Sequence, residues 1–370
     1  MSNPFQQPQY PNYGPGNYGG PANYGQGNLG PPVNYGAYGP PPPKNSGPNW
    51  VLIILGILGG GGILFAAACC GGIFWLASPP KASVQASQPF EVVTVPLPAF
   101  PDRGLNRHTM EAGVTREEVS FGARDGFYSP PGHGGILWIY LPEGQHPPGS
   151  LPCVLICGAG STLVQGMSLG DSDVPEHLPY ARAGIAVVAY ELDGPGERGG
   201  METRPYETFK QSRAGLVNAR NALEYTLAKI PEVNPSRIYS AGHSSAGTMA
   251  LLFAEHEPRL AGCLAYAPCC DMQRQYPGMR LRVHSGALPG LADFVVQSSP
   301  RTHESRLNCP LFLFYAQDDY GAADLPDFAD RLKQQGKDVT FVVVPAGGHY
   351  DSMIREGVPK GIEWIKTNKP

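Results

Sequence analysis

The chain has little net charge, no zinc-type cysteine spacing and no phosphate-loop motif. Its formal net charge of −4 over 370 residues is too small to indicate a partner such as nucleic acid. The eight cysteines never occur in the paired CxxC spacing of a structural zinc site. The pattern GxxxxGK[ST] is also absent, which argues against a nucleotide-phosphate loop. The sequence therefore predicts no metal, no other cofactor and no nucleic-acid partner.

Charged side chains are also missing from residues 45–80. Within this stretch, Trp50–Ala77 is long enough for a membrane span, because about 20 apolar residues cross a bilayer core. Trp50 and Trp75 lie near its ends, where interfacial aromatic residues are expected. We interpret residues 50–77 as one transmembrane helix that acts as a signal anchor.

The composition changes on both sides of this segment. Residues 1–49 repeat the triplet NYG and contain Lys44 as their only lysine or arginine, so they have too little aliphatic surface to offset ordering entropy. We expect a disordered tail, either a flexible spacer or an interaction segment that uses tyrosine and proline. Residues 78–113 are predicted to be a Pro-rich linker, and residues 114–370 a catalytic domain.

Strand-like and helical patterns alternate through residues 114–370, which is typical of an α/β domain. Short apolar runs such as CVLIC and IAVVAY indicate buried parallel strands. We predict about eight strands in a mostly parallel sheet flanked by helices. The expected strands are 117–122, 136–141, 153–157, 185–190, 237–241, 263–266, 311–315 and 340–344. The expected helices are 206–229, 248–255, 328–335 and 361–367.

The motif GHSSAG follows the strand predicted at 237–241 and precedes a helical run. A nucleophile elbow is a tight strand-to-helix turn, and the residues two before and two after its nucleophile must be small. Ser244 meets this requirement with Gly242 and Ala246. Ser245 would place His243 at a position where an imidazole clashes. Ser244 is therefore the predicted nucleophile.

Two further residues follow strand ends in the order serine, acid, histidine that this type of site requires. Asp319 follows the strand predicted at 311–315, and it suits the acid better than Asp318. His349 follows the strand predicted at 340–344, after two glycines. A serine hydroxyl needs a base to take its proton, and the acid sets the tautomer of that base. We assign His349 as base and Asp319 as acid.

The oxyanion that develops in such a reaction needs backbone N–H donors. We predict that Ser245, the residue after the nucleophile, donates one. The second is expected from the CGAG turn after the strand 153–157, at Ala159.

These motifs make residues 114–370 similar to α/β-hydrolases of the prolyl oligopeptidase and dienelactone hydrolase kind. The stretch from NPSRIYSAGHSSAG through DD to GGHYD resembles the second half of those domains. The resemblance implies an α/β-hydrolase fold. Family members with dienelactone activity use a cysteine nucleophile, whereas the elbow here offers serine. No β-propeller pattern precedes the domain, so an esterase is expected rather than an oligopeptidase.

Three functions remain open from the sequence. The first is a carboxylic-ester hydrolase that forms an acyl-enzyme, and the second is a serine peptidase of the prolyl oligopeptidase type. The third is a non-catalytic binding protein that keeps the fold. The expected partners are a small ester or peptide substrate and the membrane, and the oligomeric state is unknown. Because a tether and spacer retain a hydrolase that would otherwise leave the cell, we expect the catalytic domain to be extracytoplasmic.

Overall fold

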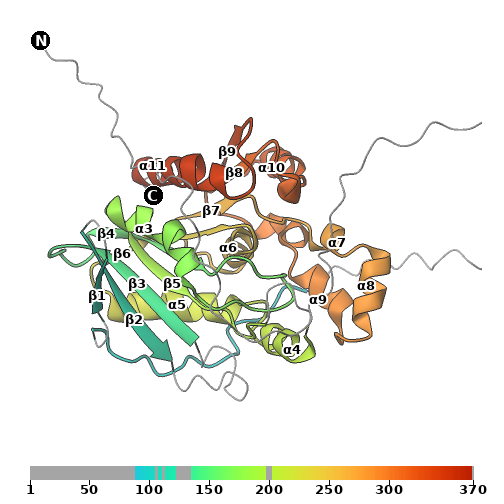
Figure 1. The fold of residues 1–370 in the computed structure, drawn as a ribbon, viewed down its shortest axis with the longest axis horizontal. Coiled ribbons are helices and arrows are strands. Elements are labelled where there is room, and N and C mark those ends of the chain that lie inside the picture. Colours follow the sequence, from blue (N-terminus) through green and yellow to red (C-terminus); the bar gives the residue numbers. More distant parts are fainter. Residues whose placement is uncertain (1–87, 105–106, 111–112, 122–134, 197–201, 369–370) are drawn as a thin grey trace, which may run out of the picture. The chain divides into compact units, whose positions relative to one another are not determined.

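Nine strands of the described chain form one mixed sheet in the computed structural model of the protein (Figure 1). The structure describes residues 88–104, 107–110, 113–121, 135–196 and 202–368. The strands are β1 (Arg107–Met110), β2 (Val114–Phe121), β3 (Gly135–Pro142), β4 (Leu151–Cys157), β5 (Ala186–Tyr190), β6 (Val233–His243), β7 (Gly262–Tyr266), β8 (Leu311–Ala316) and β9 (Val339–Val344). Their spatial order is β1-β2-β3-β5-β4-β6-β7-β8-β9.

Helices connect most of these strands. The α-helices are α3 (Val174–Arg182), α4 (Thr203–Gln211), α5 (Leu216–Lys229), α6 (Ser245–His256), α7 (Met272–Gln275), α8 (Gly278–Ser285), α9 (Leu291–Gln297), α10 (Leu325–Gln334) and α11 (Val358–Thr367). Short helical turns are η1 (Asp171–Asp173), η2 (Pro300–Thr302), η3 (Glu304–Arg306), η4 (Tyr320–Ala322) and η5 (Met353–Gly357).

The predicted tail and membrane helix lie outside this description. The chain divides into two units, Met1–Lys81 and Ala82–Pro370, and every described residue belongs to the second. The regions 1–49 and 50–77, and residues 78–87 of the predicted linker, are therefore outside the described residues. Within the described part, no helix has the length and apolar character that a membrane span requires.

The sheet has an antiparallel edge and a parallel centre. Strands β1, β2, β3 and β5 pair antiparallel. From β5 the order continues with β4, β6, β7, β8 and β9, and every neighbouring pair in this part is parallel. All residues of β4, β5 and β7 are buried, as expected for strands covered on both faces. The mostly parallel sheet predicted from the sequence is confirmed, with β1 as an additional edge strand.

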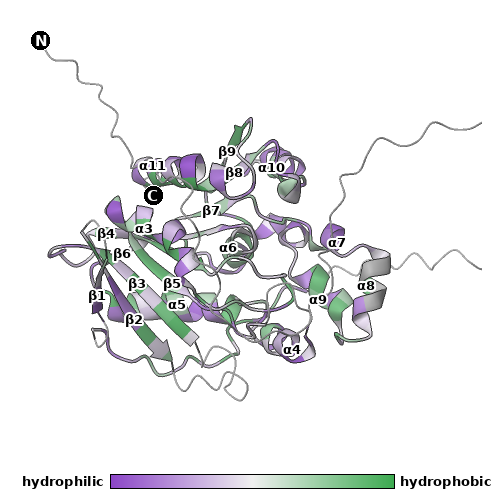
Figure 2. Ribbon diagram, in the orientation of Figure 1, coloured by the Kyte–Doolittle hydropathy of each residue, from purple (hydrophilic) through white to green (hydrophobic). Residues whose placement is uncertain are grey.

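Alternate residues of each central strand enter two different cores. In β4, Cys153 and Leu155 face one core, which contains residues of α5, α6, α9 and α10. Val154 and Ile156 face the other, which contains residues of α3 and α11. Figure 2 shows the resulting pattern, with hydrophobic residues along β3 and β5 and more polar residues on the outer helices. The sheet is therefore a central layer with helices on both faces.

The single long helix predicted at 206–229 is instead two helices, α4 and α5. They are separated by three consecutive residues with positive φ, Arg213 (58°), Ala214 (55°) and Gly215 (84°). A left-handed backbone cannot continue a right-handed helix. The apolar spacing continues across the break, because Phe209 and Leu216 are both buried in the same core, so periodicity alone did not reveal it.

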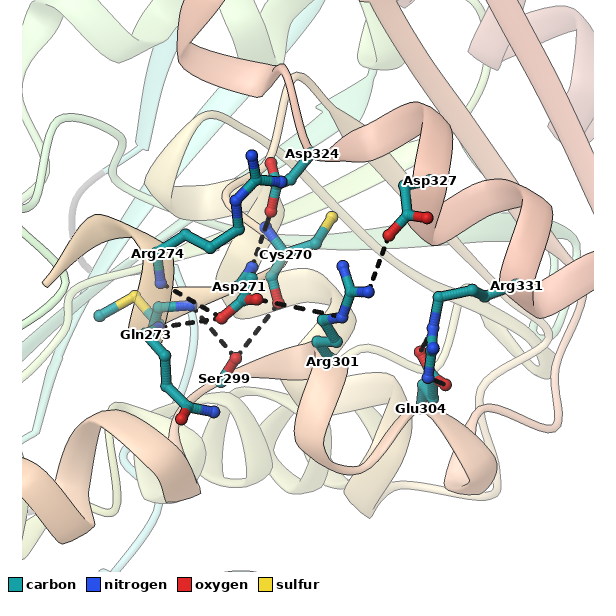
Figure 3. A network of polar contacts seen from close by, with 11 residues as sticks. Cys270, Asp271, Gln273, Arg274, Ser299, Arg301, Glu304, Asp324, Asp327 and Arg331 are labelled. Carbon is teal, nitrogen blue, oxygen red and sulfur yellow. Dashed lines mark hydrogen bonds and ion pairs between the residues drawn. The ribbon is translucent and has the colours of Figure 1, made fainter. Parts of the chain in front are cut away.

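Polar contacts hold the long connection between β7 and β8 against α10. The Asp324 carboxylate accepts hydrogen bonds from the N–H groups of Cys270 (3.1 Å) and Asp271 (2.8 Å). Arg301 pairs with Asp327 at 2.7 Å, which ties η2 to the same helix. Figure 3 shows this network between the turn after β7, η2 and α10. The connection is thus fixed at both of its ends.

The segment expected to be a linker packs on the domain in its described part. Phe100 contacts the rings of Phe121 (6.0 Å between centroids) and Tyr225 (5.6 Å). The Arg220 guanidinium donates to the carbonyls of Val92 (2.8 Å) and Val95 (2.7 Å). Residues 88–104 are therefore part of the folded unit, because their aromatic side chains and carbonyls find partners on α5 and β2.

A buried carboxylate anchors the end of this segment. Glu117 on β2 is 1% exposed and forms ion pairs with Arg103 (3.1 Å) and Arg107. Burial by itself raises the pKa of Glu117, but the hydrogen bonds and positive charges of Arg103 and Arg107 outweigh it, and the pKa lies below its ordinary value. The carboxylate therefore stays ionised in the folded protein.

We predict that Glu117→Gln lowers the free energy of unfolding by about 1–3 kcal/mol at neutral pH. A lowered folded-state pKa contributes stability that is present above the ordinary glutamate pKa and is lost as pH falls through the folded-state value. The difference from wild type should therefore shrink towards about pH 3. Urea unfolding at neutral pH and at about pH 3 measures this difference in stability. Glu363→Gln, on the exposed face of α11, is the control. A difference that does not change with pH would contradict this account.

Candidate active site

Ser244 lies at the turn between β6 and α6 with φ 56° and ψ −121°. Positive φ is uncommon for a residue with a side chain, and it is a form of strain that surrounding structure must hold. The Ser244 N–H donates to the carbonyl of Tyr266 on the neighbouring strand β7, at 2.8 Å. The turn thus has the strained strand-to-helix geometry predicted from GHSSAG.

The small residues around Ser244 are in close contact. A Cβ placed on Gly242 would lie 2.3 Å from the carbonyl oxygen of Ala246 and 2.8 Å from its Cβ. Real Cβ atoms do not approach backbone this closely. The chain can make this turn only because residue 242 is glycine and residue 246 has no more than a methyl group.

Ser245 points into the protein and holds the turn after β4. It is 7% exposed, and its Oγ accepts hydrogen bonds from the N–H groups of Gly160 and Ser161, both at 3.0 Å. The two adjacent serines therefore have different surroundings. The Ser245 hydroxyl is engaged inside, whereas Ser244 is half-buried at the tip of the turn.

The two predicted oxyanion donors belong to the two segments that the Ser245 hydroxyl joins. Ala159 is in the turn that Ser245 holds, and the Ser245 N–H is at the first turn of α6. Neither N–H donates to another residue in the described ranges. The first N–H groups of a helix have no partner within it, so the Ser245 N–H is suited to bind an anion.

Asp319 and His349 are joined by a hydrogen bond, as the sequence predicted for acid and base. The distance from Asp319 Oδ2 to His349 Nδ1 is 2.7 Å. A carboxylate only accepts, so Nδ1 carries the proton and Nε2 is left as an acceptor. Asp319 is 6% exposed, whereas the His349 side chain is 41% exposed. The base therefore reaches solvent while its acid is covered.

The environment keeps the Asp319 carboxylate ionised. Burial raises the pKa of this group, but the hydrogen bond from His349 and the positive charge that its ring carries when protonated lower the pKa by more than burial raises it. The N–H of Gly321 also donates to Asp319 Oδ1 at 3.0 Å. The resulting pKa lies below the ordinary value for aspartate, so Asp319 is charged at neutral pH.

Asp318 has a separate contact with the same loop. Its two carboxylate oxygens accept the N–H groups of Gly347 and Gly348, both at 3.1 Å. Both glycines have positive φ (134° and 65°), so the turn before His349 depends on them. The two adjacent aspartates thus have different roles. Asp318 binds the backbone of the turn before His349, and Asp319 binds the His349 ring. The sequence did not predict this contact.

Ser244 forms no hydrogen bond with the base in the described part of the chain. The hydrogen bonds among the described residues include none between the Ser244 hydroxyl and the His349 ring. The neighbouring residue His243 contacts that ring, with centroids 4.5 Å apart. In structures without substrate, the bond from nucleophile to base is often long and tightens on binding.

No metal or thiol site competes with this arrangement in the residues that the structure describes. They contain no cluster of three or more His, Cys, Asp or Glu side chains that could hold a metal ion. Cys153, Cys157 and Cys263 are fully buried, and burial raises the pKa of each thiol. These thiols stay protonated and unreactive at neutral pH.

The fold and the matching family define the class of protein. The chain is an α/β-hydrolase, a serine hydrolase of the esterase or peptidase kind. The model of the prolyl oligopeptidase family matches residues 176–367, more than half of the chain. The protein belongs to this family. No curated protein sequence matches it.

Solved structures with similar folds include esterases and a peptidase. An acetyl xylan esterase from Paenibacillus sp. R4 is 18% identical, with a TM-score of 0.53 over 74% of this chain and 90% of that one. The S-formylglutathione hydrolase FrmB from Staphylococcus aureus is 16% identical, with a TM-score of 0.50 over 68% and 98%. The acylaminoacyl peptidase of Pyrococcus horikoshii is 16% identical, with a TM-score of 0.52 over 69% and 40%. At these identities the likeness concerns the fold.

We predict that Gly242→Ala destabilises the protein by about 3 kcal/mol or more, because a methyl group there meets backbone atoms that cannot move away. Gly278→Ala is the matched control, since a Cβ at that position meets no atom within 4 Å. Urea unfolding measures both variants. Equal stability of the two would show that the elbow is not held by this contact.

Proposed function

We propose that the protein is a carboxylic-ester hydrolase that forms an acyl-enzyme on Ser244. The observation that carries the proposal is the hydrogen bond that His349 donates to Asp319, beside the strained Ser244 turn. This pair leaves Nε2 of the base free to accept a proton, and the turn presents the Ser244 hydroxyl at the carboxyl edge of the sheet.

The reaction then follows from these positions. His349 Nε2 takes the proton of Ser244 as Oγ attacks the ester carbonyl. The N–H groups of Ala159 and Ser245 bind the negative oxygen of the tetrahedral intermediate. His349 returns the proton to the leaving alcohol, and the acyl group remains on Ser244. A water molecule, activated by the same base, attacks the acyl carbonyl and releases the acid.

Contacts around the site favour a substrate that is recognised by its ester group over one that is recognised by a free amino terminus. An aminopeptidase needs a carboxylate to bind the substrate ammonium group. Three carboxylates near His349 already have partners within the protein: Asp319 with the His349 ring, Asp318 with two N–H groups, and Glu176 with His243. Two of the similar structures are named an acetyl xylan esterase and an S-formylglutathione hydrolase. A peptidase remains the alternative, supported by the family match.

A panel of short p-nitrophenyl esters and aminoacyl p-nitroanilides tests this choice. The proposal predicts turnover of the esters at rates at least about 100-fold above those of the anilides. Faster cleavage of the anilides would favour the peptidase. Neither turnover nor labelling by a fluorophosphonate would favour the non-catalytic alternative.

We predict that Ser244→Ala lowers kcat by on the order of 10⁶, because the attacking oxygen is removed. Ser245→Ala should keep a measurable rate, lowered by roughly 10- to 100-fold, because the turn bearing Ala159 loses the acceptor that holds it. Steady-state kinetics on p-nitrophenyl acetate measures both variants, with folding checked by circular dichroism. Survival of activity in Ser244→Ala, or equal and complete loss in both, would contradict the assignment.

From the sequence we further propose that residues 50–77 anchor the protein in a membrane with the catalytic domain outside the cytoplasm. We expect the full chain to remain in the membrane pellet after an alkaline carbonate wash, and protease added to intact cells to remove the domain. A variant that lacks residues 50–77 is the control and should leave the pellet. Release of the full chain by carbonate would argue against the anchor, and complete protection from protease would reverse the orientation.

A further inference from the structure

His243, the last residue of β6, is 4% exposed, and each of its ring nitrogens has a polar contact. Its Nε2 lies 3.0 Å from the backbone carbonyl oxygen of His349. Its Nδ1 lies 3.6 Å from a carboxylate oxygen of Glu176 on α3, and Glu176 is 5% exposed. A buried pair of ionisable side chains thus lies directly behind the predicted base.

The carbonyl of His349 sets the tautomer of His243. A carbonyl oxygen only accepts, so Nε2 of His243 carries a proton. The carboxylate of Glu176 lies against Nδ1, the other ring nitrogen. Glu176 therefore contacts His243 at the ring nitrogen that does not bind the carbonyl of His349.

His243 contacts the base through its ring as well as through its backbone. The two imidazole rings have centroids 4.5 Å apart and are tilted by 45°. The ring of Tyr350, the next residue of the loop, lies 5.8 Å from that of His243. Asp319 holds the His349 ring from another direction through Nδ1. The position of the base along the loop is thus fixed by His243, whereas its rotation is fixed by Asp319.

We propose that His243 is a positioning residue for the reaction, which holds His349 against the elbow through the hydrogen bond from Nε2, and that Glu176 holds the His243 ring in place through its contact with Nδ1. The inference rests on the proposed ester hydrolysis. It assigns a function to the second residue of GHSSAG, whose identity the elbow geometry alone leaves open. It also links α3 to the catalytic loop.

Two pairs of variants in the full chain test these two polar contacts separately from the size of the side chains. The amide nitrogen of glutamine lies about where Nε2 does, so His243→Gln keeps a donor for His349. His243→Asn places its amide near Nδ1 and loses that donor. Glu176→Gln keeps a polar partner for Nδ1, and Glu176→Met removes it at nearly equal volume. His108→Asn, on exposed β1, is the control.

We expect His243→Asn to lower kcat by about 10- to 100-fold with little change in KM, because a misplaced base slows proton transfer without weakening substrate binding. His243→Gln should stay within about 5-fold of wild type, and Glu176→Met should lose more activity than Glu176→Gln. The control should match wild type. Thermal unfolding identifies any variant that does not fold, and the Glu176 pair still tests the proposal if the His243 pair is lost.

Equal losses in the two His243 variants, or a full rate in His243→Asn, would overturn the inference, and so would equal rates in the two Glu176 variants. Each of these results leaves ester hydrolysis intact. A wild-type protein without ester turnover or fluorophosphonate labelling would instead refute the proposed function before any variant is compared.

Discussion

The close approach of Gly242 to Ala246 is the constraint on which the site depends. Because these two residues touch, the chain between them must turn sharply, and Ser244 adopts a backbone conformation with positive φ. The same turn sends Ser245 inward, where its hydroxyl holds Gly160 and Ser161. One steric contact therefore separates the two adjacent serines and connects the elbow to the predicted oxyanion turn.

The parallel sheet brings the remaining groups to this turn. Strands β4, β6, β8 and β9 run in the same direction, so the residues that follow each of them meet at one edge. Asp319 follows β8, His349 follows β9, and Ala159 follows β4. Residues far apart in the sequence are thereby brought to the sheet edge at which the Ser244 turn lies, and two aspartates hold the loop that carries the base.

The parts of the fold that could be predicted are those with a strong local pattern. Buried strands are short apolar runs, and the elbow has an explicit size rule, so the sheet and the contact between Asp319 and His349 could be expected. The break at Arg213–Gly215 could not, because the apolar spacing continues through it. The contacts of Asp318 and His243 depend on how loops from different strands meet, and no local pattern encodes that. The docking of residues 88–104 likewise depends on distant partners such as Arg220.

The most direct measurement is the identity of the residue that reacts. The full-length protein is treated with a fluorophosphonate, digested, and the modified peptide is sequenced by mass spectrometry. The account predicts a single phosphonate on Ser244, formed faster than on the same protein after denaturation. A phosphonate on Ser245 or on another residue, with Ser244 unmodified, would contradict it.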